Sequence, residues 1–511
     1  MKAIKKTLSF MLSRLVITVV LILLQMGLIA FYLIKLADYG GWVQTALIIG
    51  SLSMVLFVIW RDDNPAYKMG WIMLLCLFPI LGGTMYFFFG NKRPAKSLKK
   101  KLEPQEEEHW KDIPQSAGFD SVENTRLRET MGYVSGVGKY PAWDNSRVDY
   151  FPSGERMYVK ILEDLKKAEK FIFVEFFIIN SGKMWDGIFQ ILREKVKEGV
   201  EVRLIYDDVG SIRNLPKRFY ADMKEAGIEI LTFNPLKPFA SLIYNNRDHR
   251  KIIVVDGDVA YSGGINIADE YINEEKRFGY WKDSGIRVEG DAVWNFSVMF
   301  LNMWNAFKKT EDSYDRFRPS ETRESLRMEK GMVQPYADTP LDDENLGENV
   351  YLEIINCARK YVYIFTPYLV IDNEMMTALR LAAKRGVDVR IVTPGIPDKK
   401  LIFRLTRSYY RPLIRAGVKI YEFTPGFVHA KSFIADDKIG VVGTINMDYR
   451  SLFLHFECAT LMVECRCLQD LKEDCLETMD RSKLIELKDS GRRGFIGLMI
   501  DSILRAMSPL L

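Results

Sequence analysis

The sequence has few histidines, few cysteines and almost no net charge. Its 511 residues include 71 lysines and arginines, 67 aspartates and glutamates, and four histidines. This near balance gives no global argument for nucleic acid as a partner. The chain is long for one domain and can bury a large core.

The cysteines show no metal-binding pattern. None belongs to a C-x-x-C pair, and Cys465 and Cys467 lack the neighbouring histidine or cysteine that a zinc site needs. We therefore expect buried or free thiols in a reducing compartment at all six positions: Cys76, Cys357, Cys458, Cys465, Cys467 and Cys475.

Apolar residues are concentrated in three stretches near the N-terminus, Leu15–Ile34, Gly41–Trp60 and Met69–Phe89. Each is close to the length of about 20 residues that a bilayer-crossing helix needs. A cleavable signal peptide fits the first stretch less well, because its core is too long and lacks a small-residue cleavage pattern. A buried helical hairpin is the alternative for the other two. We predict a transmembrane region over residues 1–90.

Basic residues cluster directly after the third stretch, over residues 92–101. By the positive-inside rule, this cluster places the rest of the chain in the cytoplasm. The basic residues between Lys2 and Arg14 also prefer the inside, and three crossings cannot satisfy both clusters. The larger cluster decides our prediction of a multi-pass protein whose C-terminal part is cytoplasmic, and the path of Leu15–Ile34 stays open.

One sequence pattern occurs twice without a gap. His249 to Asn266 and His429 to Asn446 both fit H-x-K-x4-D-x6-G-[G/T]-x-N. Side chains alternate along a strand, so each histidine and the lysine two residues later should point the same way. A single H-x-K is usually accidental. Duplication of the whole pattern in a chain with four histidines indicates a site.

The residue types suit attack on a phosphodiester. A neutral imidazole can attack phosphorus while a protonated imidazole gives the leaving oxygen its proton. An unperturbed histidine titrates near pH ~6.5, so His249 and His429 could hold opposite protonation states near neutrality. The non-bridging oxygens would then be bound by two lysines and two asparagines: Lys251, Lys431, Asn266 and Asn446.

Two pairs of carboxylates accompany the motifs. Asp283 and Glu457 follow the two histidines at comparable distances, where each could fix a histidine tautomer and stabilise imidazolium. Asp256 and Asp436 complete the motifs and are grouped with their catalytic residues. We expect them to anchor the strand-to-turn geometry rather than to contact substrate.

The duplication extends beyond the motifs to whole β-α units. Helices and strands alternate from Phe151, and the same order returns after about residue 345. We predict α/β halves that pack about a pseudo-twofold axis and bring the two histidines into one site. The predicted segments after residue 90 are a charged linker (91–145), a first half (146–310), a connector (311–345), a second half (346–490) and an amphipathic tail (491–511). The tail suits a helix in the membrane interface, and a helix packed on the core is the alternative.

The doubled motif resembles the phospholipase D superfamily, and the surrounding chain is similar to the bacterial cardiolipin synthase family. Asp207–Ser211 resembles the family's "DxxGS" turn, Thr366–Tyr368 its "TPY" strand end, and Asn446–Ser451 with Glu457 its "NxDxRSxxxNxE" block. Asn64–Gly90 resembles its N-terminal membrane module. The chain departs from the family in its additional first apolar stretch and in His455, where the family commonly has asparagine.

The resemblance implies two phospholipase D-like halves with one active site, in an enzyme of the bacterial inner membrane. The implied reaction joins two phosphatidylglycerol molecules into cardiolipin and glycerol. His249 would form a phosphatidyl-histidine, and His429 would act as acid and then as base. The implied partners are membrane phospholipids, with no nucleic acid, no metal and no cofactor; the oligomeric state stays open. The alternatives are a hydrolytic phospholipase D, a phosphatidyltransferase with another alcohol, a membrane-tethered nuclease and a non-catalytic lipid-binding scaffold.

Overall fold

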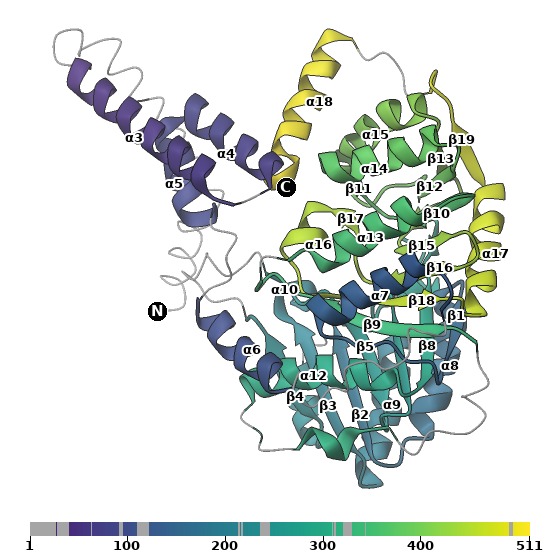
Figure 1. The fold of residues 1–511 in the computed structure, drawn as a ribbon. Helices are drawn as coiled ribbons and strands as arrows, with labels where there is room; N and C mark the ends of the chain where they lie inside the picture. Colours follow the sequence, from purple (N-terminus) through teal and green to yellow (C-terminus); the bar gives the residue numbers. More distant parts are fainter. Residues whose placement is uncertain are drawn as a thin grey trace. The chain divides into compact units, whose positions relative to one another are not determined.

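The computed structural model describes most of the chain: residues 27, 40–62, 64–90, 96–109, 122–212, 215, 218–235, 246–308, 310, 313–319, 330–342, 344–489 and 494–510. The chain divides into two compact units (Figure 1). The smaller comprises Met1–Ala95, Leu236–Asn245 and Phe495–Leu511. The larger comprises Lys96–Pro235 and Asn246–Gly494.

The smaller unit contains helices α3 (Gly40–Trp60), α4 (Pro65–Leu77), α5 (Pro79–Phe89) and α18 (Phe495–Met507), followed by the short helix η6 (Ser508–Leu510). The first three pack around a small apolar cluster of Val58, Tyr67, Trp71, Leu75 and Tyr86. Helix α5 approaches α4 closely at Gly82, where a Cβ atom would lie 2.6 Å from the carbonyl oxygen of Leu74. Glycine is therefore the residue that this helix pair requires.

The third apolar stretch, Met69–Phe89, is not one continuous helix. It breaks at Phe78, whose backbone is extended (φ −136°, ψ 74°) directly before Pro79. Proline disfavours helical geometry in the residue before it and donates no backbone hydrogen bond, so a new helix starts there. The stretch Leu15–Ile34 lies outside the described residues, apart from position 27. Among the helices that the structure describes, none is long and apolar enough to cross a membrane.

Apolar side chains nevertheless face outward on several helices of this unit. Helix α3 exposes Trp42 and Leu56, and α18 exposes Phe495, Ile496 and Leu498. The predicted tail is thus helical over Phe495–Met507 and has no buried side chain between these residues.

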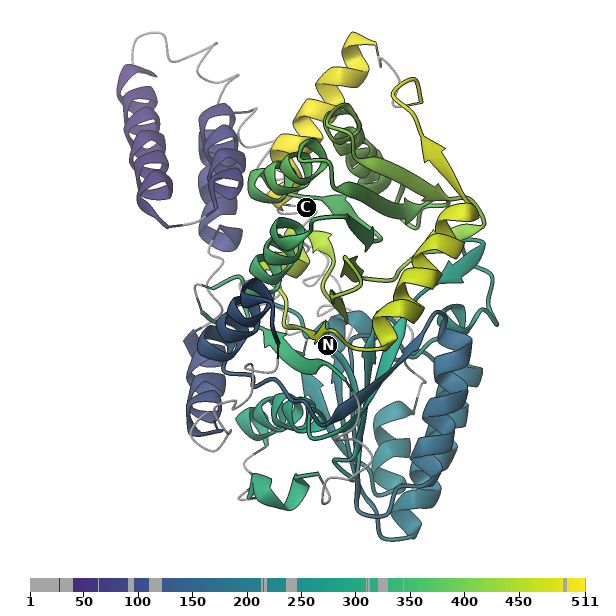
Figure 2. The same cartoon turned by 45° about the vertical axis from the view of Figure 1, so that its right-hand side comes forward.

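The larger unit contains two mixed sheets with the same strand order (Figures 1 and 2). The first runs in the order β1 (Ser146–Phe151), β8 (Gly285–Gly290), β6 (Val259–Gly263), β5 (Lys251–Val255), β2 (Phe171–Phe176), β3 (Glu201–Asp207) and β4 (Glu229–Phe233). The second runs in the order β9 (Met332–Asp338), β18 (Glu457–Val463), β16 (Ile439–Gly443), β15 (Ser432–Ala435), β10 (Tyr361–Phe365), β12 (Asp388–Pro394), β13 (Lys419–Phe423) and β19 (Ser482–Ile485).

Strand by strand, the second sheet repeats the first and adds β19 at one edge, which confirms two α/β halves of the same topology. Strands β5 and β15, which follow the motif histidines, have every residue buried. Strand β9 lies within the predicted connector, 311–345, yet it takes the edge position that β1 takes in the first sheet. The sheet of the second half therefore begins at Met332.

Helices cover the sheets. The first half contains α8 (Gly154–Lys166), α9 (Lys183–Lys197), α10 (Asp208–Ser211), α11 (Phe219–Glu225), η3 (Asp269–Ile272), α12 (Val293–Phe307) and η4 (Tyr314–Phe317). The second contains α13 (Leu346–Cys357), α14 (Asn373–Lys384), α15 (Lys400–Arg415), α16 (Tyr449–Phe453) and α17 (Cys467–Asp480). The predicted linker, 91–145, carries two further helices, α6 (Lys96–His109) and α7 (Thr125–Gly138).

Helices and strands of one half contact strands of the other half. Helix α17 of the second half lies beside β1 of the first (Figure 2). The Tyr150 hydroxyl donates a hydrogen bond of 2.5 Å to Asp474 on that helix. A parallel pair joins β7 (Tyr280–Lys282) to β14 (Gly426–Val428). A second small pair joins β11 (Leu369–Val370) to β17 (Met447–Asp448) within the second half.

The two motif aspartates close equivalent turns. The Asp256 carboxylate accepts hydrogen bonds of 2.8 Å from the backbone N–H groups of Glu169, Lys170 and Phe171, at the start of β2. Asp436 accepts three bonds of 2.7–2.9 Å from residues 359–361, at the start of β10. Both aspartates have positive φ, 54° and 55°, which aspartate tolerates better than most residues. We propose that they anchor the strand carrying each motif.

The negative charges of Asp256 and Asp436 should affect the stability of the protein rather than its catalytic activity. Asparagine tolerates the same backbone geometry but removes the charge and one set of acceptor lone pairs. We expect Asp256→Asn and Asp436→Asn each to lower the free energy of unfolding by about 1.5–3 kcal/mol, the range for hydrogen bonds to charged groups. Denaturant unfolding measures this loss. A large fall in the activity of the folded protein at unchanged stability would contradict an anchoring role.

Candidate active site

Both motif histidines leave their own sheets and pair with backbone of the opposite half. His249 lies just before β5, and its N–H donates a bond of 2.9 Å to the carbonyl oxygen of Phe456. His429 lies just after β14, and its N–H donates a bond of 2.7 Å to the carbonyl oxygen of Lys282. Each histidine therefore lies before the apolar strand of its own half, at the point where its backbone pairs with the other half.

The carboxylates are exchanged in the same way. His249 Nδ1 lies 2.9 Å from both Oε1 and Oε2 of Glu457, and His429 Nδ1 lies 2.8 Å from Oδ2 of Asp283. Each half thus supplies a histidine to the site and the carboxylate for the other half's histidine. A carboxylate on Nδ1 holds the proton there and leaves the Nε2 lone pair available.

Each carboxylate is itself held in place. Thr444 and Ser451 donate hydroxyl hydrogen bonds to Glu457, and the N–H of Ser284 donates a bond of 2.8 Å to Asp283. Glu457 thus accepts from two side-chain hydroxyl groups, whereas Asp283 accepts from a backbone N–H. The variable position of the motif, glycine in one copy and threonine in the other, explains part of this difference. Thr444 occupies it in the second copy, whereas a Cβ atom on Gly264 in the first copy would collide with the Asp283 carboxylate.

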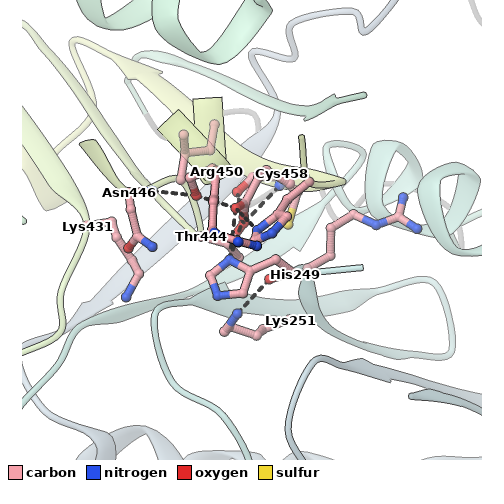
Figure 3. Close-up of polar contacts among 12 residues, drawn as sticks. His249, Lys251, Lys431, Thr444, Asn446, Arg450 and Cys458 are labelled. Atoms are coloured by element: carbon pink, nitrogen blue, oxygen red, sulfur yellow. Dashed lines mark hydrogen bonds and ion pairs between the residues drawn. The ribbon is translucent and has the colours of Figure 1, made fainter. Parts of the chain in front are cut away.

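Two buried lysines complete the charged cluster (Figure 3). Both are 1% exposed; Lys251 Nζ donates a bond of 2.5 Å to the His249 carbonyl oxygen, and Lys431 Nζ lies 2.9 Å from His429 Nδ1. Burial lowers the pKa of Lys251 to about 8 and that of Lys431 to about 7, although Asp283 and Glu457 raise both values. Since each lysine feels the carboxylates of both halves, the two motifs belong to one electrostatic site.

The pKa values of both the two carboxylates and the two histidines lie below their ordinary ranges, for different reasons. Burial alone would raise the pKa of Asp283 and Glu457, but the adjacent imidazoles hold both pKa values below their ordinary range. Burial lowers the pKa of His249 to about 3 and of His429 to about 4. The histidine pair therefore does not hold opposite protonation states in the free site at neutral pH. An anionic phosphodiester between the imidazoles would raise both values.

The two motif asparagines differ in their surroundings. The Asn266 side chain accepts a bond of 3.1 Å from the Ile178 N–H and donates one of 2.7 Å to the Tyr271 hydroxyl, whose ring packs 5.3 Å from His429. The Asn446 side-chain oxygen is buried and has no hydrogen-bond partner. Asn446 therefore has the freer amide for a ligand, and Asn266 positions the wall beside His429.

Sequence reasoning did not find the aromatic and imidazole walls of the site. The rings of Phe177 and His455 lie 5.0 Å and 5.6 Å from that of His249, and Trp281 lies 5.4 Å from His429. His455 and Trp281 occupy equivalent positions, each two residues before a site carboxylate. That shared spacing could have identified both residues as neighbours of the site.

Comparisons with known proteins agree with this geometry. The family model described as "Cardiolipin synthase, PLD-like domain" matches residues 161–283 and 351–477, and the model described as "Phospholipase_D-nuclease N-terminal" matches residues 51–91. A cardiolipin synthase of Alkalihalophilus pseudofirmus is 33% identical over 95% of this chain and 99% of its own. Cardiolipin synthase 1 of Bacillus cereus is 33% identical over 97% of each chain. The structure of a phosphatidylserine synthase from Haemophilus influenzae shares the fold, with a TM-score of 0.55, 15% identity and coverage of 76% of this chain and 98% of its own.

The exchanged carboxylates predict that loss of either one disables a histidine of the opposite half. Glu457→Gln and Asp283→Asn should each lower phosphodiester turnover by roughly 10²–10⁴-fold, because a neutral amide neither fixes the tautomer nor stabilises imidazolium. Steady-state kinetics measure this loss, and circular dichroism confirms folding. Thr460→Val, a buried change on the same strand as Glu457, is the matched control. Turnover within threefold of the parent protein in either amide variant would contradict the assigned role.

Proposed function

The chain belongs to the cardiolipin synthase family of phospholipase D-like proteins, and from this premise we propose that it joins two phosphatidylglycerol molecules into cardiolipin and glycerol. It is a phosphatidyltransferase, since the family model matches both halves and the relatives carry that activity in their names. The observation that carries the proposal is the pair of buried imidazoles held by exchanged carboxylates beside two lysines.

In the first step, Nε2 of His249 attacks the phosphorus of one phosphatidylglycerol. The bond between phosphorus and the headgroup glycerol oxygen breaks, and that oxygen takes a proton from His429. A phosphorus–nitrogen bond to His249 remains. We assign the attack to His249 because the first motif of the resembled superfamily usually supplies the nucleophile.

In the second step, neutral His429 removes the proton from a headgroup hydroxyl of a second phosphatidylglycerol. The hydroxyl oxygen attacks the phosphorus, and the phosphorus–nitrogen bond breaks. His249 is then neutral again, and His429 carries the proton until cardiolipin leaves the site. Lys251, Lys431 and Asn446 would bind the non-bridging oxygens on which negative charge accumulates.

The acceptor in this scheme must be a lipid hydroxyl rather than water. The reacting groups are largely removed from water: His249 is 7% exposed and His429 is 8% exposed. A water-poor site of this kind favours transfer to a bound alcohol over hydrolysis. The outward-facing apolar side chains on α3 and α18 suit a protein that works at a lipid surface. We propose a membrane enzyme, and the multi-pass topology stays a prediction.

Product analysis tests this function directly. The purified chain in mixed micelles with phosphatidylglycerol as the only phospholipid should form cardiolipin and glycerol in equal amounts, as measured by mass spectrometry. Phosphatidic acid without cardiolipin would show a hydrolase and overturn the proposal.

The histidine variants serve as matched controls in the same assay. His249→Ala and His429→Ala should both abolish turnover, and only His429→Ala could accumulate a phosphatidyl adduct on the protein. An adduct on His429 in the His249→Ala variant would reverse the two roles without changing the reaction.

The lysine pKa values predict an alkaline loss of activity. A lysine is charged below its pKa, so kcat/KM should fall as the pH rises through about 7 and 8, where Lys431 and Lys251 lose their charge in the free enzyme. The Lys431→Arg variant keeps its charge, and its decline should start at higher pH. A kcat/KM that stays constant from roughly one pH unit below the pKa of Lys431 to roughly one unit above that of Lys251 would show that neither charge is needed.

A further inference from the structure

His455, whose ring flanks that of His249, has no role in the proposed mechanism. Its ring lies 5.6 Å from the His249 ring, yet neither of its nitrogen atoms has a hydrogen-bond partner, and both are shielded from solvent. Its Nδ1 lies 3.8 Å from Oε1 of Glu457, beyond hydrogen-bond range. An imidazole with two shielded and unused nitrogen atoms has capacity for a ligand.

Three candidate metal ligands of two types, imidazole and carboxylate, meet at this point. One ligand atom each from His249, His455 and Glu457 lies within 4.8 Å of the others, the one such group of three among the residues that the structure describes. Two separations are known individually: 2.9 Å between His249 Nδ1 and Glu457, and 3.8 Å between His455 Nδ1 and Glu457. Ligands of a tetrahedral zinc ion, at bonds of about 2.0–2.1 Å, lie roughly 3.3 Å apart. The two separations bracket that value.

We propose that His249, His455 and Glu457 form a binding site for Zn²⁺ and that occupation of this site switches the enzyme off. Two imidazoles and one carboxylate are a ligand set that zinc prefers, and the fourth position stays open to water. The proposal rests on the proposed function only for its inhibitory consequence. The binding itself follows from the positions of the three side chains.

The inhibition follows from the histidine tautomer. Neutral His249 has one ring proton, held on Nδ1 by Glu457. Zinc on Nδ1 takes the lone pair of that atom, so the ring proton moves to Nε2. Nε2 then has no lone pair with which to attack phosphorus. The ion also neutralises the carboxylate that would stabilise imidazolium.

The other half provides an internal comparison. The equivalent of His455 is Trp281, which packs 5.4 Å from His429 and has no atom that ligates zinc. The His429–Asp283 pair therefore lacks a third ligand at this position. Zinc should bind at one histidine of the pseudosymmetric pair, with a stoichiometry of one ion per chain.

The test uses Co²⁺ as a spectroscopic probe for the zinc site in the full chain in detergent. The parent protein should develop the visible absorption of tetrahedral Co²⁺, which Zn²⁺ abolishes by displacement, and Mg²⁺ should have no effect. His455→Asn should weaken Zn²⁺ binding by at least roughly 10–100-fold, the loss typical of removing even an outer partner of a metal ligand. His455→Asp, whose carboxylate oxygen takes the place of Nδ1, should still bind.

Activity assays give the second readout. Zn²⁺ should inhibit the parent protein strongly and His455→Asn much less, when each protein is compared with its own activity in the absence of the metal. His109→Asn, a histidine on α6, is the matched control and should be inhibited like the parent protein. Absence of the Co²⁺ band in the parent protein, or its persistence unchanged in His455→Asn, would overturn the proposal. The Co²⁺ band does not depend on turnover, so a chain that binds metal but makes no cardiolipin would refute the proposed function alone.

Discussion

Two histidine–carboxylate pairs that cross between the halves are the interaction on which the site depends. His249 needs Glu457, and His429 needs Asp283, although the partners are 208 and 146 residues apart in the chain. Neither half contains a complete acid–base unit, so a correctly oriented imidazole exists only when both halves are folded and docked. The backbone bonds from His249 to Phe456 and from His429 to Lys282 enforce the same exchange. Catalytic competence is thereby tied to the interface between the halves.

Within this symmetric frame, small differences separate the two histidines. The second motif has Thr444, which donates to Glu457, where the first has Gly264 to make room for Asp283. One histidine is flanked by Trp281 and the other by His455. With a fully symmetric pair, the orientation of the bound substrate alone would decide which histidine attacks and which acts as acid. These differences around the rings are therefore where a division of labour can arise.

The repeat could be predicted from the sequence because its two copies have similar residues at equivalent positions, and such patterns reflect local secondary structure. It could not predict the exchange of carboxylates, since spacing along the chain says nothing about which half a side chain faces. Strand β9 falls within the predicted connector and contains Pro335, a residue that sequence patterns rarely place in a strand. It lies at a sheet edge, where proline is tolerated. The helix break at Phe78–Pro79 could have been predicted from the proline, but the surrounding residues are uniformly apolar and favoured one continuous helix.

The charges around the imidazoles explain how a site with two neutral histidines can supply a proton. Lys251 and Lys431 balance Asp283 and Glu457, so these four side chains have no net charge when the lysines are protonated. In that state, burial keeps both imidazoles neutral. A phosphodiester adds one negative charge between them, and the neutral balance is restored when one imidazole gains a proton. In the proposed mechanism, substrate binding thus creates the acid that the first step consumes, and departure of the lipid product lets the site lose that proton again.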